Sequence, residues 1–200
     1  MDVMDRRRDA ADMTLSTASR TAARRTTARL DALVGEVREA VGRGLPPELT
    51  AYLVAERLAP FLGESDLLTG EQRQGDPDRY RQHVLHAESD GSFSVVALVW
   101  LPGQVTPIHD HVSWCVTGVL EGEESERRYR LVSDGTTARL VATEHVVNAQ
   151  GTVCGFAPPG DIHRVRNNCT STAISLHVYG ADIARLGTSI RRVYKLPADR

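Results

Sequence analysis

The chain has 200 residues, of which 41% are hydrophobic and 25% charged, as in an ordinary globular protein that can bury a core. The formal net charge is −2, so the composition gives no reason to expect a nucleic-acid or acidic-membrane partner. No apolar run approaches the ~20 residues that a membrane helix needs.

The N-terminus is rich in charge and lacks the apolar stretch of a secretory signal. The cysteines, Cys115, Cys154 and Cys169, contain no CxxC pair. A disulfide framework or a zinc knuckle is therefore not expected, and a reducing cytoplasm is the expected compartment.

Two helices are predicted before the main domain. Residues 1–28 have no sustained apolar face and are expected to form a disordered tail. Apolar residues recur at helical spacing over residues 30–41, and Gly42 follows as a stop signal. A pair of prolines opens a second helix that ends near Pro60. Residues 29–79 are thus predicted to be a helical N-terminal extension.

From about Tyr80 the pattern changes to short apolar runs separated by Gly, Pro, Asp and Asn. Strands are predicted at residues 93–101, 112–120, 127–132, 138–147, 153–157 and 172–179. Several strands at this spacing indicate a sandwich or barrel, so residues 80–195 are predicted to form a mainly β domain.

A histidine pair suggests a metal site. His109 and His111 are separated by one residue, and alternate residues of a strand share one face. Both imidazoles can therefore reach one ion, while Asp110 points away. An isolated HxH is weak evidence, because two histidines on a strand are often only polar surface.

A third histidine strengthens the prediction. Pro158 and Gly160 form a turn that delivers His163 to the start of another strand. The two segments together resemble the two motifs of the cupin family. In the first motif, Gly103, His109, His111 and Gly122 fit; in the second, Pro158, Gly160, His163 and Asn167 fit, with Gly151 off by one. The resemblance implies a double-stranded β-helix, or jelly-roll barrel, that binds a metal.

The departure from the cupin pattern is informative. The usual cupin glutamate ligand falls at or next to Cys115, followed by Val116, and neither side chain replaces a carboxylate. An ion held by three neutral imidazoles keeps its full charge. About three of the six positions of an octahedral iron then stay open for an anionic thiolate and dioxygen.

A second signature lies in residues 172–179. The period of a strand puts Ser175, His177 and Tyr179 on one face. These side chains can form a hydrogen-bonded relay in which the serine holds the imidazole and the imidazole holds the phenol. The alternative is an antiparallel strand with one solvated side.

The HDH, HRV and SxHxY segments in this order resemble the cysteine dioxygenase family of thiol dioxygenases, over roughly residues 80–192. The resemblance implies one Fe(2+) per chain on His109, His111 and His163. It also implies an outer relay of Ser175, His177 and Tyr179. The implied reaction oxidises a small thiol carboxylate with dioxygen to a sulfinic acid.

The same resemblance suggests how the substrate carboxylate is bound. Members of the family carry arginine or glutamine on the strand before the HxH, and here Gln82 matches. The glutamine-type members supply an arginine from the C-terminal segment, for which Arg191 is the best match and Arg192 or Arg185 stay open. This pattern is similar to enzymes that favour 3-mercaptopropionate over cysteine. A register slip of one residue would turn Arg81 inward instead.

Cys115 is expected to lie near Tyr179 in the substrate pocket, because some relatives join a cysteine after the HxH to the relay tyrosine by a thioether. The favoured alternative is a small buried thiol without a crosslink. Two rival functions also stay open: a cupin oxygenase with a different reaction outcome, and a cupin that binds a small ligand without catalysis.

Overall fold

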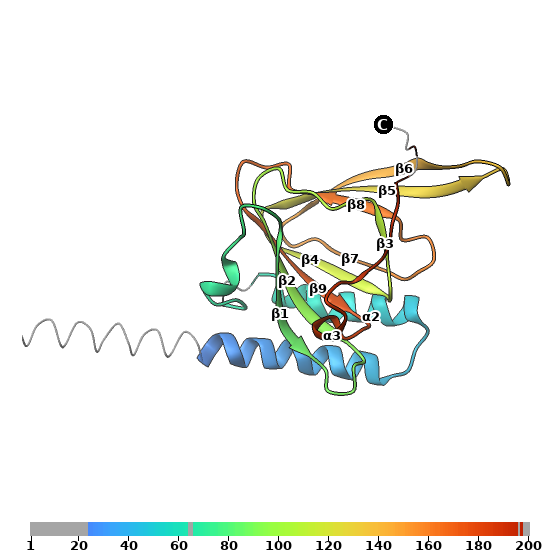
Figure 1. Ribbon diagram of the computed structural model, residues 1–200. Helices are drawn as coiled ribbons and strands as arrows, with labels where there is room; N and C mark the ends of the chain where they lie inside the picture. Colours follow the sequence, from blue (N-terminus) through green and yellow to red (C-terminus); the bar gives the residue numbers. More distant parts are fainter. Residues whose placement is uncertain (1–23, 64–65, 196, 198–200) are drawn as a thin grey trace, which may run out of the picture.

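The protein is described from a computed structural model over residues 24–63, 66–195 and 197 (Figure 1). A helix over residues 24–42 is followed by α2 (Pro47–Leu58) and by two short 3-10 helices, η1 (Ala59–Phe61) and η2 (Glu71–Arg73). The strands are β1 (Arg81–Ala87), β2 (Ser94–Trp100), β3 (His109–His111), β4 (Cys115–Glu121), β5 (Glu123–Ser133), β6 (Ala138–Ala149), β7 (Val153–Phe156), β8 (His163–Arg166), β9 (Ala173–Tyr179) and β10 (Ile190–Val193). A short helix, α3 (Ile183–Leu186), lies between β9 and β10.

The strands form two five-stranded antiparallel sheets. One sheet has the order β1-β2-β9-β4-β7 and the other β10-β3-β8-β5-β6. Figure 1 shows the second sheet above the first, with the chain crossing repeatedly between the two layers. Successive segments of the chain thus contribute to both layers, and the mainly β architecture with N-terminal helices is confirmed.

The helices cover the outer face of the first sheet (Figure 1). Val37 and Val54 from the helices are fully buried in one cluster with Val116 and Leu176 of the sheet. A side chain at Gly155 would meet the carbonyl oxygen of Ala51 at 3.0 Å, so the absence of a side chain lets α2 approach β7 closely. This packing gives the sheet a covered face and directs its other face to the barrel interior.

The central strands are buried on both faces. Every residue of β2 and of β9 is buried. On β9, Ile174, Leu176 and Val178 pack toward the helices, while Tyr179 belongs to a separate interior cluster with Cys115. The relay face of β9 is therefore an interior face and not a solvated one.

The structure corrects three expectations. Residues 24–28 belong to the first helix and not to a disordered tail, and Thr26 there is buried; residues 1–23 of the expected tail lie outside the described residues. Strand β5 begins at Glu123, four residues before the expected start, and β10 was not expected at all. Within the described chain, no helix has the length and apolar character required to cross a membrane.

Candidate metal centre and its surroundings

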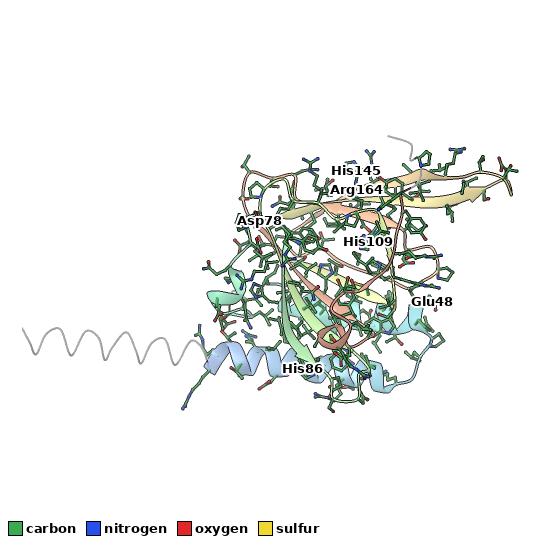
Figure 2. The ribbon with its side chains drawn as sticks, viewed as in Figure 1. Glu48, Asp78, His86, His109, His145 and Arg164 are labelled. Carbon is green, nitrogen blue, oxygen red and sulfur yellow. The ribbon has the colours of Figure 1, made fainter. Side chains whose placement is uncertain are left out.

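Three histidines meet inside the barrel. His109 and His111 lie on β3, and His163 is the first residue of β8, which pairs with β3 through His109 and His163. All three side chains are buried, and their potential ligand nitrogens lie within 4.8 Å of one another. His109 is labelled in Figure 2, where it lies between the two layers. The expectation that these histidines form one cluster with the geometry of a metal site is met.

Each imidazole is fixed by a hydrogen bond from Nδ1. The Nδ1 atoms of His109, His111 and His163 lie 2.9 Å from the carbonyl oxygen of Pro107, 3.0 Å from Asp161 Oδ2 and 2.8 Å from Glu126 Oε1. A carbonyl or carboxylate oxygen only accepts, so each Nδ1 donates and carries the proton. Nε2 is then the nitrogen with a free lone pair on every ring, which is the arrangement seen in metal-binding histidines.

Glu126 is the most strongly held of these partners. Burial raises the pKa of its carboxyl, but hydrogen bonds from His163 and Arg128 outweigh burial and lower the pKa to about 2. Its Oε2 accepts from Arg128 at 3.1 Å and from Asn148 at 3.4 Å. Glu126 is therefore an ionised carboxylate that orients His163.

Burial keeps His109 and His111 in their neutral forms near pH 7. Burial, followed by the proximity of the other two histidines, lowers the pKa of His109 to about 3. Burial also lowers the pKa of His111, although its hydrogen bond to Asp161 opposes this. Three clustered imidazole nitrogens, each with a free lone pair, are donors that a first-row metal ion accepts, so the donor set fits such an ion.

The relay residues are in contact. Ser175 Oγ lies 2.9 Å from His177 Nε2, and Tyr179 Oη lies 3.0 Å from His177 Nδ1. Trp100 Nε1 donates to Ser175 Oγ at 3.2 Å, and Thr117 Oγ1 lies 3.3 Å from His177 Nδ1. The structure thus brings the three residues together in the order serine, histidine, tyrosine.

One small cavity joins the histidines to the relay. Its free volume is about 30 Å³, and it is lined by the three histidines, His177 and Tyr179. Apolar and hydroxyl-bearing side chains also line it, among them Leu98, Phe156, Val165 and Ser189. A cavity of this size admits only a small ligand.

The register of β1 settles which side chain faces the cavity. Gln82 pairs with Leu98 of β2 and lines the cavity, whereas Arg81 is exposed. The alternative register with Arg81 inward is therefore wrong.

The C-terminal arginines do not line the cavity. The cavity is lined instead by the preceding residues Thr188, Ser189 and Ile190. Arg191 is the extra residue at a bulge in the β10–β3 pairing, and its side chain is exposed. Arg192 donates from Nε to Asp110 Oδ2 at 2.8 Å, and Arg185 is exposed at α3. Since Asp110 also accepts from Tyr194, it points away from the histidine cluster, as expected.

Cys115 lies beside the relay. It is fully buried, lines the cavity and is the direct cross-strand partner of Tyr179. Its Sγ lies 3.9 Å from both Thr117 Oγ1 and His177 Nδ1.

Several residues of the site are not predicted by the sequence patterns. Asp161 holds both the backbone N–H and the Nδ1 of His111, and it stands two residues before His163. Glu124 and Glu126 alternate with half-buried residues on β5. This alternation would have indicated two inward carboxyls if the strand had been predicted to begin at Glu123.

Asn167 has a structural role. It is fully buried, and its side-chain amide donates to the carbonyls of Trp100 at 2.9 Å and Ser171 at 2.8 Å. This residue of the second motif therefore ties the end of β2 to the loop before β9.

Two antiparallel sheets around a buried group of three histidines define a cupin barrel with a site that could hold a metal. The chain belongs to the cysteine dioxygenase type I family, because the sequence model of that family matches residues 72–186, more than half of the chain.

Cysteine dioxygenase type 1 from Homo sapiens is 28% identical over 107 residues, and the alignment covers 52% of each chain. The Bos taurus protein of the same name is 27% identical over the same length. The chain thus spans about half the length of the curated relatives it matches.

The similarity to solved structures is low when measured by TM-score. The TT1209 protein from Thermus thermophilus is 26% identical, with a TM-score of 0.41 over 57% of this chain and 96% of that one. An RmlC-like cupin protein from Desulfovibrio desulfuricans is 24% identical, with a TM-score of 0.37 over 54% and 88%. The barrel architecture is defined by the strand order of the two sheets.

Proposed function

We propose that the protein is a mononuclear iron thiol dioxygenase that oxidises a small thiol carboxylate, cysteine or 3-mercaptopropionate, to its sulfinic acid. The observation that carries the proposal is that one small cavity joins three buried imidazoles to a phenol held by His177. Membership of the cysteine dioxygenase type I family supports it.

His109, His111 and His163 would hold one Fe(2+) per chain. When bound, the ion supplies redox chemistry and a positive charge that favours the thiolate form of the substrate. Neutral imidazole ligands leave that charge uncompensated, while Asp161 and Glu126 fix the ring orientations. Leu98, Phe156 and Val165 limit the entry of water.

The substrate carboxylate is expected to meet Gln82, whose amide can donate a hydrogen bond inside the cavity. Arg191 follows directly after the cavity-lining Ser189 and Ile190. Its exposed side chain would have to turn inward on binding to form a charge-assisted pair with the carboxylate. Tyr179, which also lines the cavity, would hydrogen-bond to the substrate or to dioxygen.

The test is metal analysis of the purified protein followed by oxygen uptake with cysteine, 3-mercaptopropionate and cysteamine. We expect stoichiometric iron and fastest uptake with a thiol acid. Preference for cysteamine, which has no carboxylate, would refute the assigned substrate class. Stoichiometric metal without any thiol oxidation would favour a different oxygenase or a ligand-binding cupin. We also propose that the protein acts in the cytoplasm, because its three cysteines are free, as expected in a reducing compartment.

A further inference from the structure

The interior of the barrel contains a carboxyl group that the proposed chemistry does not use. Glu124 of β5 is 1% exposed, and its Oε1 has no hydrogen-bond partner. In the described part of the chain, no cation pairs with it. A buried carboxyl without a compensating charge is costly for folding, so its presence calls for a functional explanation.

Glu124 lies at the end of the relay that is remote from the histidine cluster. Its carboxyl interacts with the hydroxyl of Ser175 and the indole of Trp100. Ser175 in turn contacts His177 Nε2 at 2.9 Å, and His177 Nδ1 contacts Tyr179 Oη at 3.0 Å. A hydrogen bond between Glu124 and Ser175 would extend the relay to four residues, from a buried carboxyl to a phenol in the cavity.

When His177 Nδ1 bonds to its closer neighbour, Tyr179 Oη at 3.0 Å, and not to Thr117 Oγ1 at 3.3 Å, counting protons along these four residues gives two complete arrangements. If Glu124 is ionised, Ser175 donates to it, and His177 must donate to Ser175 from Nε2–H. Nδ1 of His177 then accepts from Tyr179, so the phenol offers only lone pairs to the cavity.

If Glu124 is protonated, donor and acceptor exchange roles in each hydrogen bond from Glu124 to Tyr179. Glu124 donates to Ser175, Ser175 donates to His177 Nε2, and His177 donates from Nδ1–H to Tyr179. The phenol hydrogen is then free to point into the cavity. Trp100 Nε1 donates to Ser175 in both arrangements, and the Ser175 oxygen is satisfied in both.

We propose that Glu124 is a positioning residue whose protonation state decides whether the Tyr179 hydroxyl donates to, or accepts from, a ligand in the cavity. This inference deepens the proposed function and rests on it for the identity of that ligand. An anionic thiolate or a reduced oxygen species needs a donor, so the protonated form of Glu124 is the one that supports oxidation.

The surroundings of Glu124 place its titration in the physiological range. Burial raises its pKa to about 7; the nearby Ser175 hydroxyl and, more weakly, the Trp100 indole oppose the rise, and the charge of Glu126 on the same strand adds to it. Among the described residues, Cys154 of β7 and Tyr179 of β9 also sense its charge, and burial raises the pKa of both. His177 remains neutral, because burial lowers its pKa to about 3.

The test is a pH titration in which ¹⁵N NMR reports which ring nitrogen of His177 carries the proton. The sample is the full-length protein with ¹⁵N-labelled histidine, loaded with diamagnetic zinc. His177 is assigned by comparison with His177→Gln. Between about pH 5.5 and about pH 8.5, we expect the ring proton to move from Nδ1 to Nε2 with a midpoint near the pKa of Glu124. In Glu124→Gln the ring should keep one tautomer throughout.

Two further variants sharpen the test. Ser175→Ala should also abolish the transition, because it cuts the link between Glu124 and His177. Glu123→Gln, a change of the neighbouring carboxyl, should leave the transition in place. A single His177 tautomer in the wild type, or an unchanged transition in Glu124→Gln, would overturn the inference.

A second readout links the inference to catalysis. With iron and the preferred thiol acid, kcat of the wild type should fall as the pH rises through the same midpoint. In Glu124→Gln, this pH dependence of kcat should be lost. If no thiol is oxidised, the proposed function fails, but the tautomer titration still decides the role of Glu124. If thiols are oxidised while the tautomer never changes, only this inference fails.

Discussion

Cys115 and Tyr179 are directly opposite each other in the antiparallel pair formed by β4 and β9. In such a pair the two side chains leave the sheet on the same face and lie close together. The sequence-based expectation that Cys115 lies near Tyr179 is therefore confirmed, and it raises the question of a thioether between them.

We expect Cys115 to remain an unmodified thiol. Its Sγ already has Thr117 and His177 as neighbours, and burial raises the pKa of the thiol well above its ordinary value, which disfavours the reactive thiolate. Peptide mass spectrometry after turnover with iron and dioxygen should give separate Cys115 and Tyr179 peptides. A joined species that lacks two hydrogens would contradict this.

Glu126→Gln should weaken metal binding by roughly 10–100-fold, because the carboxylate that orients His163 is replaced by a neutral amide. The affinity can be measured by competition with a chelator. Glu123→Gln, which changes a neighbouring carboxyl on the same strand, is the matched control and should bind metal normally. Equal affinities for all three proteins would show that Glu126 does not support the site.

Gln82→Ala should raise KM for thiol acids by at least about tenfold, as expected for a lost hydrogen bond to a charged group worth ~1.5–3 kcal/mol. Arg191→Ala should also raise KM if its side chain turns inward on binding. Arg81→Ala is the control, since Arg81 is the exposed neighbour of Gln82. Steady-state oxygen uptake measures all three, and an effect as large for Arg81→Ala would argue against a specific contact.

Glu124 should make the folded protein less stable as pH rises. Its folded pKa of about 7 lies above its ordinary value of 4.5, so the folded state binds more protons between these values. The contribution of Glu124 to the free energy of unfolding therefore falls with rising pH through this window, by about 3 kcal/mol, and is constant above it. Glu124→Gln should remove this slope in urea titrations at several pH values. A slope that persists in the variant would assign it to another group.

The sequence was sufficient to predict the residues that repeat at strand spacing or stand in a motif. His109 and His111 had to share a face, and Ser175, His177 and Tyr179 had to share another, because a strand alternates. The partners of these residues come from other strands, and their position depends on cross-strand register. Glu126 reaches His163 only because β5 pairs with β8, and that pairing is not visible in either segment alone.

The start of β5, the strand β10 and the exposure of Arg191 were not predicted for a similar physical reason. Strand β5 begins with a mostly charged segment, Glu123 to Arg128. The segment resembles a solvated loop in sequence, and only the structure shows that Glu124 and Glu126 in it are buried. Strand β10 has four residues and only weak apolar character, and it exists because it pairs with β3. Arg191 was selected by resemblance, and the bulge at this position leaves it exposed.

The central claim is that the three-histidine site uses dioxygen to oxidise the sulfur of a thiol acid. The most direct test is incubation of the iron-loaded protein with 3-mercaptopropionate or cysteine under ¹⁸O₂, followed by mass spectrometry of the product. We expect a sulfinic acid that carries two labelled oxygens, and no such product from His163→Ala, which lacks one of the three imidazoles. A product without label, a disulfide alone, or full activity in His163→Ala would contradict the account.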